Sequence, residues 1–407
     1  MRTIEDHLTA ALALVEHLPA VDVDLEDALG SVLARDVTSP TELPRFDNSA
    51  MDGYAVRADD VADAAEDSPV VLQVLADLPA GSAAEPHVGT GTAARIMTGA
   101  ALPPGADAVV PVERTDGGLV VVQVAHAVAR GAHVRRAGED ARPGDLVLAA
   151  GTELGPAQVA AAAAVGTRSL RVHARPRVAV LSTGDELVPP GQPLRRGQIP
   201  DSNSYLLAAA VRAAGGIPVR VGAVPDDAVA FRGALDRLRP DVDAVVTSGG
   251  VSMGAYDVVK EVLADEPGME FVEVAMQPGK PQGLGTLGDG TPVFALPGNP
   301  VSAFVSFEVF VRPALLRMRG LTALGRPEVA GVVADGWRPP GGRVQYMPVV
   351  VERDPQGGVA AWRVRRAARG GSGSHLVASL AAVHGLAVVG LDVDEVRPGD
   401  VVRVLLV

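Results

Sequence analysis

The sequence contains no cysteine among its 407 residues. This absence excludes a disulfide framework, thiolate metal sites and a cysteine nucleophile. Aromatic residues make up only 3% of the chain, so the cores must be packed mainly from Ala, Val and Leu within the 47% of residues that are apolar. Basic residues are outnumbered by acidic ones, and the net charge of -13 argues against broad nucleic-acid binding, which needs a basic face. The net charge does not exclude binding of an anionic small molecule, because a few local cations or helix N-termini can hold one.

Long apolar runs are absent as well. No window reaches the roughly eighteen uninterrupted apolar residues of a membrane span. The first stretch, MRTIEDHLTAALALVEHL, carries acids and histidines among its apolar residues and is typical of an amphipathic helix instead of a signal peptide. We therefore expect a soluble, cytoplasmic protein that binds neither a membrane nor nucleic acid.

The length predicts several domains. Residues 1–18 and 25–35 fit helices, and residues 156–166 fit another, with Pro at its start and Gly at its end. Short Val-rich runs separated by Gly, Pro and Asp predict a β-rich inserted domain over residues 54–140. From residue 175 to 326 strands alternate with helices, which predicts an α/β domain with a mostly parallel sheet covered on both faces. Residues 327–407 lose the helices and predict a small C-terminal β-barrel domain.

In a parallel sheet the ligand lies beyond the carboxyl ends of the strands. In this chain the loops at those ends carry most of the unusual polar residues, in the stretches STGDEL, PDD, TSGGVSMGAYD, PGKP and PGNP. Each loop alone is a common turn, but turns need no Thr, Lys or carboxylate in particular. Together the loops predict a binding site, and glycine-rich loops that feed a helix suit a phosphate. The residues in question are Ser182, Thr183, Gly184, Glu186, Asp227, Gly249, Gly250, Ser252, Asp257, Lys280, Pro297, Gly298, Asn299 and Pro300.

A second polar stretch, FDNSAMDGYAV at residues 46–56, crowds Asp47 and Asp52 with Asn and Ser and contains no Lys or Arg. It is either a turn, since these are the usual turn formers, or part of a site whose cation is not in the chain. Thr98 in RIMTGA and Asp140 in RRAGED are further polar residues of this half, although RRAGED alone could be a solvated turn. Carboxylates that converge without a partner raise one another's pKa, and Mg²⁺ relieves this repulsion.

Several common motifs are absent. GKP does not match the phosphate-binding loop of nucleotide hydrolases, because its spacing differs and Pro281 follows the lysine. The sequence contains no H-E-x-x-H pair and no G-x-S-x-G, so a zinc peptidase and a serine hydrolase are disfavoured.

The motifs FDNSAMDGYAV, IMTGA with PPGADAVVPVE, RRAGED, STGDEL, TSGGVSMGAYD, QPGKPQG and LPGNPVSAFVSFEVFVRPAL occur in this order. In this order they resemble the signatures of the molybdopterin molybdenumtransferases, whose fold also forms the E domain of gephyrin. The resemblance covers nearly the whole chain. It implies an elongated four-domain homodimer, with residues 1–53 and 141–174 as a helical, linking dimerisation domain. It also implies that adenylylated molybdopterin and molybdate are converted, with Mg²⁺, to molybdenum cofactor and AMP, in a cleft between subunits.

The resemblance also assigns roles to residues. It implies that Asp52, Thr98, Asp140, Glu186 and Lys280 act in catalysis, and that Asp52, Glu186 and Asp257 hold the metal. The other loop residues named above, with Ser374 in the late GSH motif, would bind the substrate. Many members carry a second lysine where this chain has Gln277, so anion capture would depend on Lys280, backbone amides and arginines around 363–369. Molybdopterin adenylyltransferase and molybdopterin synthase are implied partners.

Two other functions compete with this interpretation. A molybdopterin adenylyltransferase has a related α/β domain with a GG loop and a nearby acid, but would not need the flanking β domains. A non-catalytic scaffold, like gephyrin in receptor anchoring, would bind a peptide without turnover, and the short tails and the lack of a fused domain weigh against it.

Overall fold

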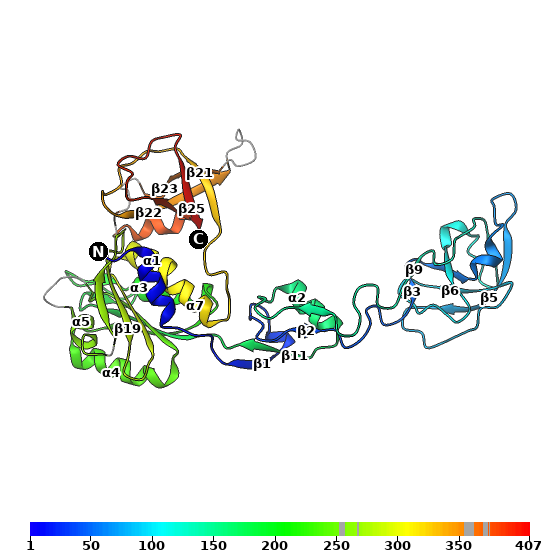
Figure 1. Ribbon diagram of the computed structural model, residues 1–407, viewed down its shortest axis with the longest axis horizontal. Helices are drawn as coiled ribbons and strands as arrows, with labels where there is room; N and C mark the ends of the chain where they lie inside the picture. Colours follow the sequence, from blue (N-terminus) through cyan, green and yellow to red (C-terminus); the bar gives the residue numbers. More distant parts are fainter. Residues whose placement is uncertain (252–256, 267, 354–361, 369–372, 374) are drawn as a thin grey trace.

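The computed structural model describes residues 1–251, 257–266, 268–353, 362–368, 373 and 375–407. Figure 1 shows an elongated molecule in which an α/β domain and a C-terminal barrel lie at one end and a β-rich domain at the other. A slender linker domain joins them. We call the β-rich unit the distal domain, and the linker and distal domains together the arm.

The α/β domain is built on a six-stranded sheet in the order β15-β12-β16-β20-β19-β17. The first four strands are parallel, and β19 and β17 extend the sheet antiparallel. The strands are β12 (Arg177–Thr183), β15 (Ile217–Val224), β16 (Ala244–Ser248), β17 (Glu270–Glu273), β19 (Pro281–Thr286) and β20 (Pro292–Leu296). A short pair, β13 (Leu187–Val188) and β14 (Ile199–Pro200), lies beside them.

Alternate residues of the central strands enter opposite cores, as the two-residue period of a strand requires. Val178 and Val180 of β12 pack with α3 (Asn203–Ala213) and α7 (Arg312–Met318) on one face. Ala179 and Leu181 pack on the other face with α4 (Ala228–Leu238) and α5 (Val258–Leu263). The predicted sheet covered on both faces is confirmed. The domain also contains η4 (Arg239–Asp241), α6 (Pro300–Ser306) and the π-helical η5 (Phe307–Val311).

The N-terminal helix α1 (Ile4–Ala13) packs on the α/β domain, where Ala11 and Val15 join the core of β12 and α7. Thr3 caps the helix, since its Oγ1 accepts a hydrogen bond of 3.0 Å from the N–H of Asp6. The linker domain therefore begins only after this helix.

The linker domain contains less helix than predicted. It consists of β1 (Ala20–Asp24), η1 (Leu25–Asp27), β2 (Val37–Thr38), β10 (Leu146–Leu148), α2 (Pro156–Ala164) and β11 (Ser169–His173). The helix predicted over residues 25–35 is wrong: only one 3₁₀ turn forms before Gly30 turns the chain with a φ of +74°. Val32 and Leu33 then form β-bridges with Glu153 and Val172, so tertiary pairing overrides local helix propensity.

The distal domain contains a five-stranded sheet in the order β7-β4-β6-β5-β8 and the separate pair β3–β9. Its elements are β3 (Asn48–Ser49), β4 (Gly53–Val56), η2 (Ala58–Val61), β5 (Val70–Leu78), β6 (Thr92–Ile96), β7 (Ala108–Pro111), η3 (Val112–Arg114), β8 (Val121–Val124) and β9 (Val134–Arg135). This confirms the predicted β-rich insertion.

The C-terminal domain is a closed barrel, as predicted. Its strands pair in the ring β22–β23–β21–β25–β24 and back to β22. The elements are β21 (Glu328–Val333), β22 (Val344–Arg353), β23 (Trp362–Arg366), η6 (Val377–Ala382), β24 (Gly385–Val389) and β25 (Val401–Leu406). The barrel is joined to the α/β domain by β18 (Met276–Gln277), which pairs in parallel with β22. None of the helices in the described part of the chain is both long and apolar enough to cross a bilayer.

One buried histidine makes the stability of this end of the molecule depend on pH. His7 of α1 is 2% exposed, and its ring lies edge-on to Phe310 with the centroids 4.6 Å apart. Burial, assisted by the charge of Arg2, lowers the pKa of His7 to about 4. The neutral ring is therefore the folded form, and its contribution to stability is complete above the unfolded pKa of about 6.5.

As the pH falls from about 6.5 to about 4, the unfolded state binds the proton first, and we expect the free energy of unfolding to drop by about 3 kcal/mol. His7→Phe keeps the aromatic contact and removes the titration, so it should be more stable relative to wild type at pH 4.5 than at pH 7.5. The measurement is the difference in urea midpoint between the two proteins at each pH. The same difference at both pH values would contradict the role of His7.

Candidate active site

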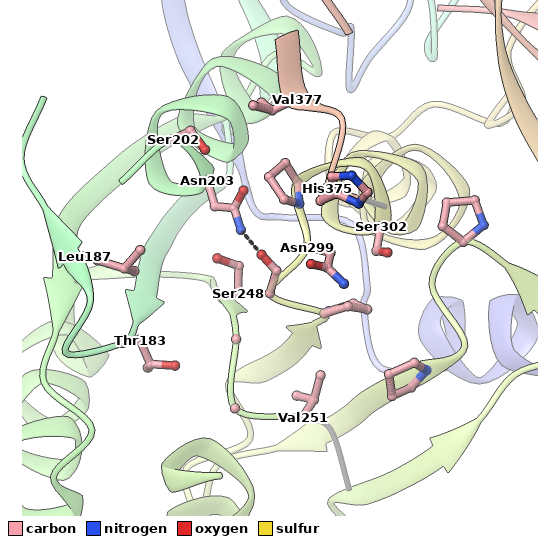
Figure 2. A pocket seen from close by; sticks show the side chains of 18 of the residues that line it. Thr183, Leu187, Ser202, Asn203, Ser248, Val251, Asn299, Ser302, His375 and Val377 are labelled. Carbon is pink, nitrogen blue, oxygen red and sulfur yellow. Dashed lines mark hydrogen bonds between the residues drawn. The ribbon is translucent and has the colours of Figure 1, made fainter. Parts of the chain in front are cut away.

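A pocket of about 930 Å³ lies at the carboxyl ends of the parallel strands. Its walls come from the loops that follow β12, β16 and β20, from the β13–β14 pair, and from the loop after β18 (Figure 2). His375 and Val377 of the barrel domain close one side. Of the predicted residues, the pocket is lined by Thr183, Gly184, Glu186, Gly249, Gly250, Asp257, Lys280, Pro297, Gly298, Asn299 and Pro300.

Glycines are required where the loops after β16 and β20 meet. Gly249 has a φ of +98°, and a Cβ there would lie 2.8 Å from Thr183 Oγ1. A Cβ on Gly298 would lie 3.3 Å from the Cα of Gly249, so the two backbones touch directly. The Nδ2 of Asn203 donates a hydrogen bond of 2.6 Å to the carbonyl of Gly298 and holds the second loop in place (Figure 2). The pocket floor is thus backbone, which a ligand can approach closely.

Two residues that line the pocket each have a buried polar atom with no hydrogen-bond partner among the described residues. Within the described part of the chain, Thr183 Oγ1 and Asn203 Oδ1 are buried and make no hydrogen bond. Buried polar groups are nearly always paired in folded proteins. Since both residues line the pocket, a polar ligand is the partner that fits.

Carboxylates gather on one part of the pocket. Glu186, Asp226 and Asp257 line it. Partial withdrawal from water raises the pKa of Asp226, and the negative charges of its neighbours, Glu186 and Asp257 among them, add to the rise. In the residues that the structure describes, no three His, Asp or Glu side chains form a metal cage by themselves. Mg²⁺ is usually held by one or two carboxylates together with substrate phosphates and water, so this set fits a Mg²⁺ that binds with a phosphate.

Cations lie on and beside the loop between β18 and β19. The Nζ of Lys280 lies 2.8 Å from Glu273 Oε1, and this contact lowers the pKa of Glu273. Gln277, which also lines the pocket, accepts a hydrogen bond of 3.0 Å from Arg343 Nη1. Arg343 directly precedes β22 and reaches the loop because β18 pairs with that strand. The loop therefore carries one cation, Lys280, and a second, Arg343, contacts Gln277 at the start of the loop from the barrel domain.

Asp52 and Thr98 form a second polar centre in the distal domain. Asp52 Oδ1 accepts hydrogen bonds from the N–H of Thr98 at 2.7 Å and from its Oγ1 at 2.8 Å. These bonds lower the pKa of Asp52, which is solvent-exposed, so the carboxylate is ionised and oriented. Asp140 is also exposed in this half of the molecule. Figure 1 shows the distal domain at the opposite end of the molecule from the α/β domain that holds the pocket. Within one chain, Asp52 is therefore far from Glu186 and Asp257.

Comparison with known proteins identifies the family. The chain is 45% identical to molybdopterin molybdenumtransferase 2 of Mycobacterium tuberculosis, and the match covers 99% of both chains. The chain belongs to the MoeA family. Residues 2–166 match the MoeA N-terminal region (domain I and II), residues 179–317 a probable molybdopterin binding domain, and residues 330–407 the MoeA C-terminal region (domain IV). The resemblance drawn from the motifs is thereby confirmed.

Other relatives agree over the full length. Molybdopterin molybdenumtransferase 1 of the same organism is 38% identical, with 99% of this chain and 98% of the relative covered. A crystal structure of the molybdopterin biosynthesis MoeA protein of Pyrococcus horikoshii superposes with a TM-score of 0.82 at 30% identity and covers 100% of both chains. The four-domain architecture is therefore that of the MoeA fold.

Some predicted residues have other surroundings than expected. Ser182 is fully buried and does not line the pocket, but its Oγ lies 3.2 Å from the Oγ of Ser248, which does. Asp227 caps α4 by accepting a hydrogen bond of 2.8 Å from the N–H of Ala230, while its neighbour Asp226 lines the pocket. Ser252 and Ser374 lie outside the described residues. For Asp47 in FDNS the chain itself supplies the cation: Arg136 Nη1 and the N–H of Ala137 donate to its carboxylate at 2.5 and 2.8 Å.

Sequence reasoning missed Arg343 and His375, and of the two acids in the PDD loop it assigned Asp227 to the site instead of Asp226. Asp226 and Asp227 are adjacent, and only the start of α4 decides which of them caps the helix. Arg343 is 66 positions from its partner Gln277 and outside every motif. His375 could have been predicted, because it directly follows Ser374 in the GSH motif.

Proposed function

We propose that this MoeA-family chain inserts molybdenum from molybdate into adenylylated molybdopterin, forming molybdenum cofactor and releasing AMP. The observation that carries the proposal is one pocket at the carboxyl edge of the sheet that is lined by carboxylates, glycine backbone and Lys280, with Arg343 bound to its lining residue Gln277. Adenylylated molybdopterin brings phosphates, and molybdate is itself an anion. Two anions approach each other only where aimed N–H groups and cations reduce their repulsion.

We assign the pocket residues as follows. Glu186 and Asp257 would hold Mg²⁺ together with substrate phosphate oxygens. A metal held there would supply positive charge to the substrate phosphates and Lewis-acid assistance to the cleavage of the phosphate bond. Lys280 and Arg343 would attract molybdate to the loop between β18 and β19, where this family often has a second lysine in place of Gln277. Thr183 and Asn203 would bind polar groups of the substrate with their unpaired atoms.

The site is completed by a second copy of the chain in this proposal. Asp52 is ionised and held by Thr98, yet it lies at the far end of the molecule from its own pocket. A homodimer in which the distal domain of one chain reaches the pocket of the other would bring Asp52 to the carboxylate wall. Asp52 would then complete the metal site or orient a water.

The test is incubation of the purified chain with adenylylated molybdopterin, molybdate and Mg²⁺. We expect AMP release that requires molybdate and equals the molybdenum cofactor formed. AMP release that is indifferent to molybdate would contradict the proposal. Synthesis of adenylylated molybdopterin from ATP as the sole activity would favour the adenylyltransferase, and peptide binding without turnover would favour the scaffold.

A further inference from the structure

The chain passes twice between the α/β domain and the arm, and the two crossings are bound to each other. The N–H of Leu18 on the first crossing donates to the carbonyl of Met318 at 2.8 Å. The N–H of Ala174 on the second crossing donates to Pro19 at 3.0 Å, and the ring Nδ1 of His173 lies 3.0 Å from the carbonyl of Leu18. These contacts meet at the C-terminal end of α7.

Arg319, the C-cap residue of α7, spans this joint with its side chain. Its Nη2 donates to the carbonyl of Gly30 at 2.6 Å and to Glu153 Oε1 at 2.8 Å, both in the linker domain. Its Nη1 donates to the carbonyl of Ala214 at 2.9 Å, at the end of α3 in the α/β domain. Arg319 is 4% exposed, so its guanidinium is shielded from water, although the Glu153 side chain is half-exposed. The planar guanidinium thus binds both domains at fixed angles, which a lysine could not do.

Side chains around the joint are packed closely against the backbone of two glycines. Gly215 has a φ of +80°, and a Cβ on it would lie 2.3 Å from Arg319 Cζ. Gly320 has a φ of +86°, and a Cβ on it would lie 2.2 Å from the His173 ring. Two side chains, one from each side of the joint, therefore rest directly on glycine backbone. The contact of His173 of the linker domain with Gly320 crosses the joint and restricts rotation of the arm, whereas Gly215 holds the Arg319 guanidinium in place.

We propose that Arg319 is a positioning residue of the reaction, because it sets the direction in which the arm leaves the α/β domain. The inference rests on the proposed intersubunit site: Asp52 sits at the far end of the arm, where a small rotation at the joint becomes a large displacement. The hydrogen bonds of Arg319 go to Ala214, Gly30 and Glu153, none of which lines the pocket. Arg319 affects the rate of AMP release because it determines where the distal domain lies relative to the partner's pocket.

The absence of native cysteine permits a direct measurement of arm direction. Cysteines introduced at Val229 of α4, 80% exposed, and at Leu119 of the distal domain, 66% exposed, can carry a donor and an acceptor dye. The labelled chain is mixed with an excess of unlabelled chain, so that each dimer reports one arm. In Arg319→Lys we expect the distribution of transfer efficiencies to broaden or shift relative to wild type.

The kinetic readout separates positioning from damage to the pocket. We expect kcat for AMP release to fall about 10²-fold in Arg319→Lys, as misplacement of a reacting group does. The dissociation constant for AMP, measured by calorimetry, should stay within about twofold of wild type, because the pocket lies within the α/β and barrel domains. Glu153→Gln, which removes only the charge of a half-exposed partner, should change the transfer distribution and kcat in the same direction as Arg319→Lys but by less.

Arg232→Lys is the matched control. Arg232 also bridges a carboxylate and a backbone carbonyl, those of Glu266 and Val262, but within the α/β domain. Arg232→Lys should lower the thermal unfolding midpoint as Arg319→Lys does, without changing the transfer distribution or kcat. Unchanged transfer in both Arg319→Lys and Glu153→Gln would overturn the inference whether or not the chain releases AMP. Changed transfer with unchanged kcat would overturn the positioning role, whereas an inactive wild type would overturn only the proposed function.

Discussion

Asp52→Asn should reduce the rate of AMP release by on the order of 10²-fold or more, while the pocket still binds AMP with wild-type affinity. The substitution keeps the shape of the side chain and an oxygen that can accept from Thr98, so the loop should retain its conformation. What it removes is the charge. The hydrogen bonds from Thr98 lower the pKa of Asp52, which is therefore ionised at neutral pH.

Asp60→Asn is the control for this result. Asp60 is another carboxylate of the distal domain that accepts a backbone hydrogen bond, from the N–H of Gly91 at 3.0 Å. It lies outside the proposed site, so the variant should release AMP at the wild-type rate. Equal AMP release by wild type and Asp52→Asn would show that our assignment of Asp52 is wrong.

Glu186→Gln should raise the Mg²⁺ concentration needed for half-maximal activity by at least about tenfold, since even the outer partners of metal ligands contribute 10- to 100-fold to affinity. Glu186 and Asp257 line the same pocket, and their charges raise the pKa of Asp226. Because Mg²⁺ favours carboxylate and phosphate oxygens, removing one carboxylate weakens the site without closing the pocket. Chelation of Mg²⁺ should abolish AMP release in both proteins.

The measurement is the rate of AMP release at rising Mg²⁺, compared with Glu266→Gln as control. Glu266 is a partly buried carboxylate of the same domain that pairs with Arg232 and lies outside the pocket. A Mg²⁺ requirement that is the same in Glu186→Gln and wild type would remove Glu186 from the metal site. Full AMP release after chelation would show that the reaction does not require the metal.

The sheet and its loops could be predicted because local signals and tertiary structure agree there. In STGDEL and TSGG a buried strand runs into Gly-rich polar loops, and Gly249 is required by both its φ of +98° and the contact with Thr183. A parallel sheet then brings such loops to one edge without further information. Thr183, Glu186 and Gly298 were therefore found from sequence.

The rest depended on contacts between residues far apart in the chain. The segment after Leu25 has helical spacing, but pairing of Val32 and Leu33 with Glu153 and Val172 takes it into the linker sheet. Arg343 reaches Gln277 only because β18 pairs with β22 across two domains. The distance between Asp52 and the pocket follows from the length of the linker domain, which composition does not reveal.

The most direct test of a site shared between two chains is a mixed dimer. Asp52→Asn and Glu186→Gln chains carrying different affinity tags are co-expressed, and the dimer that holds one of each is purified. Under limiting Mg²⁺, each parent dimer has two defective sites, whereas the mixed dimer has one site with an intact pocket and an intact distal Asp52. We predict that it releases AMP at about half the wild-type rate, as one of two equivalent sites should. A mixed dimer no more active than the better parent would contradict the shared site.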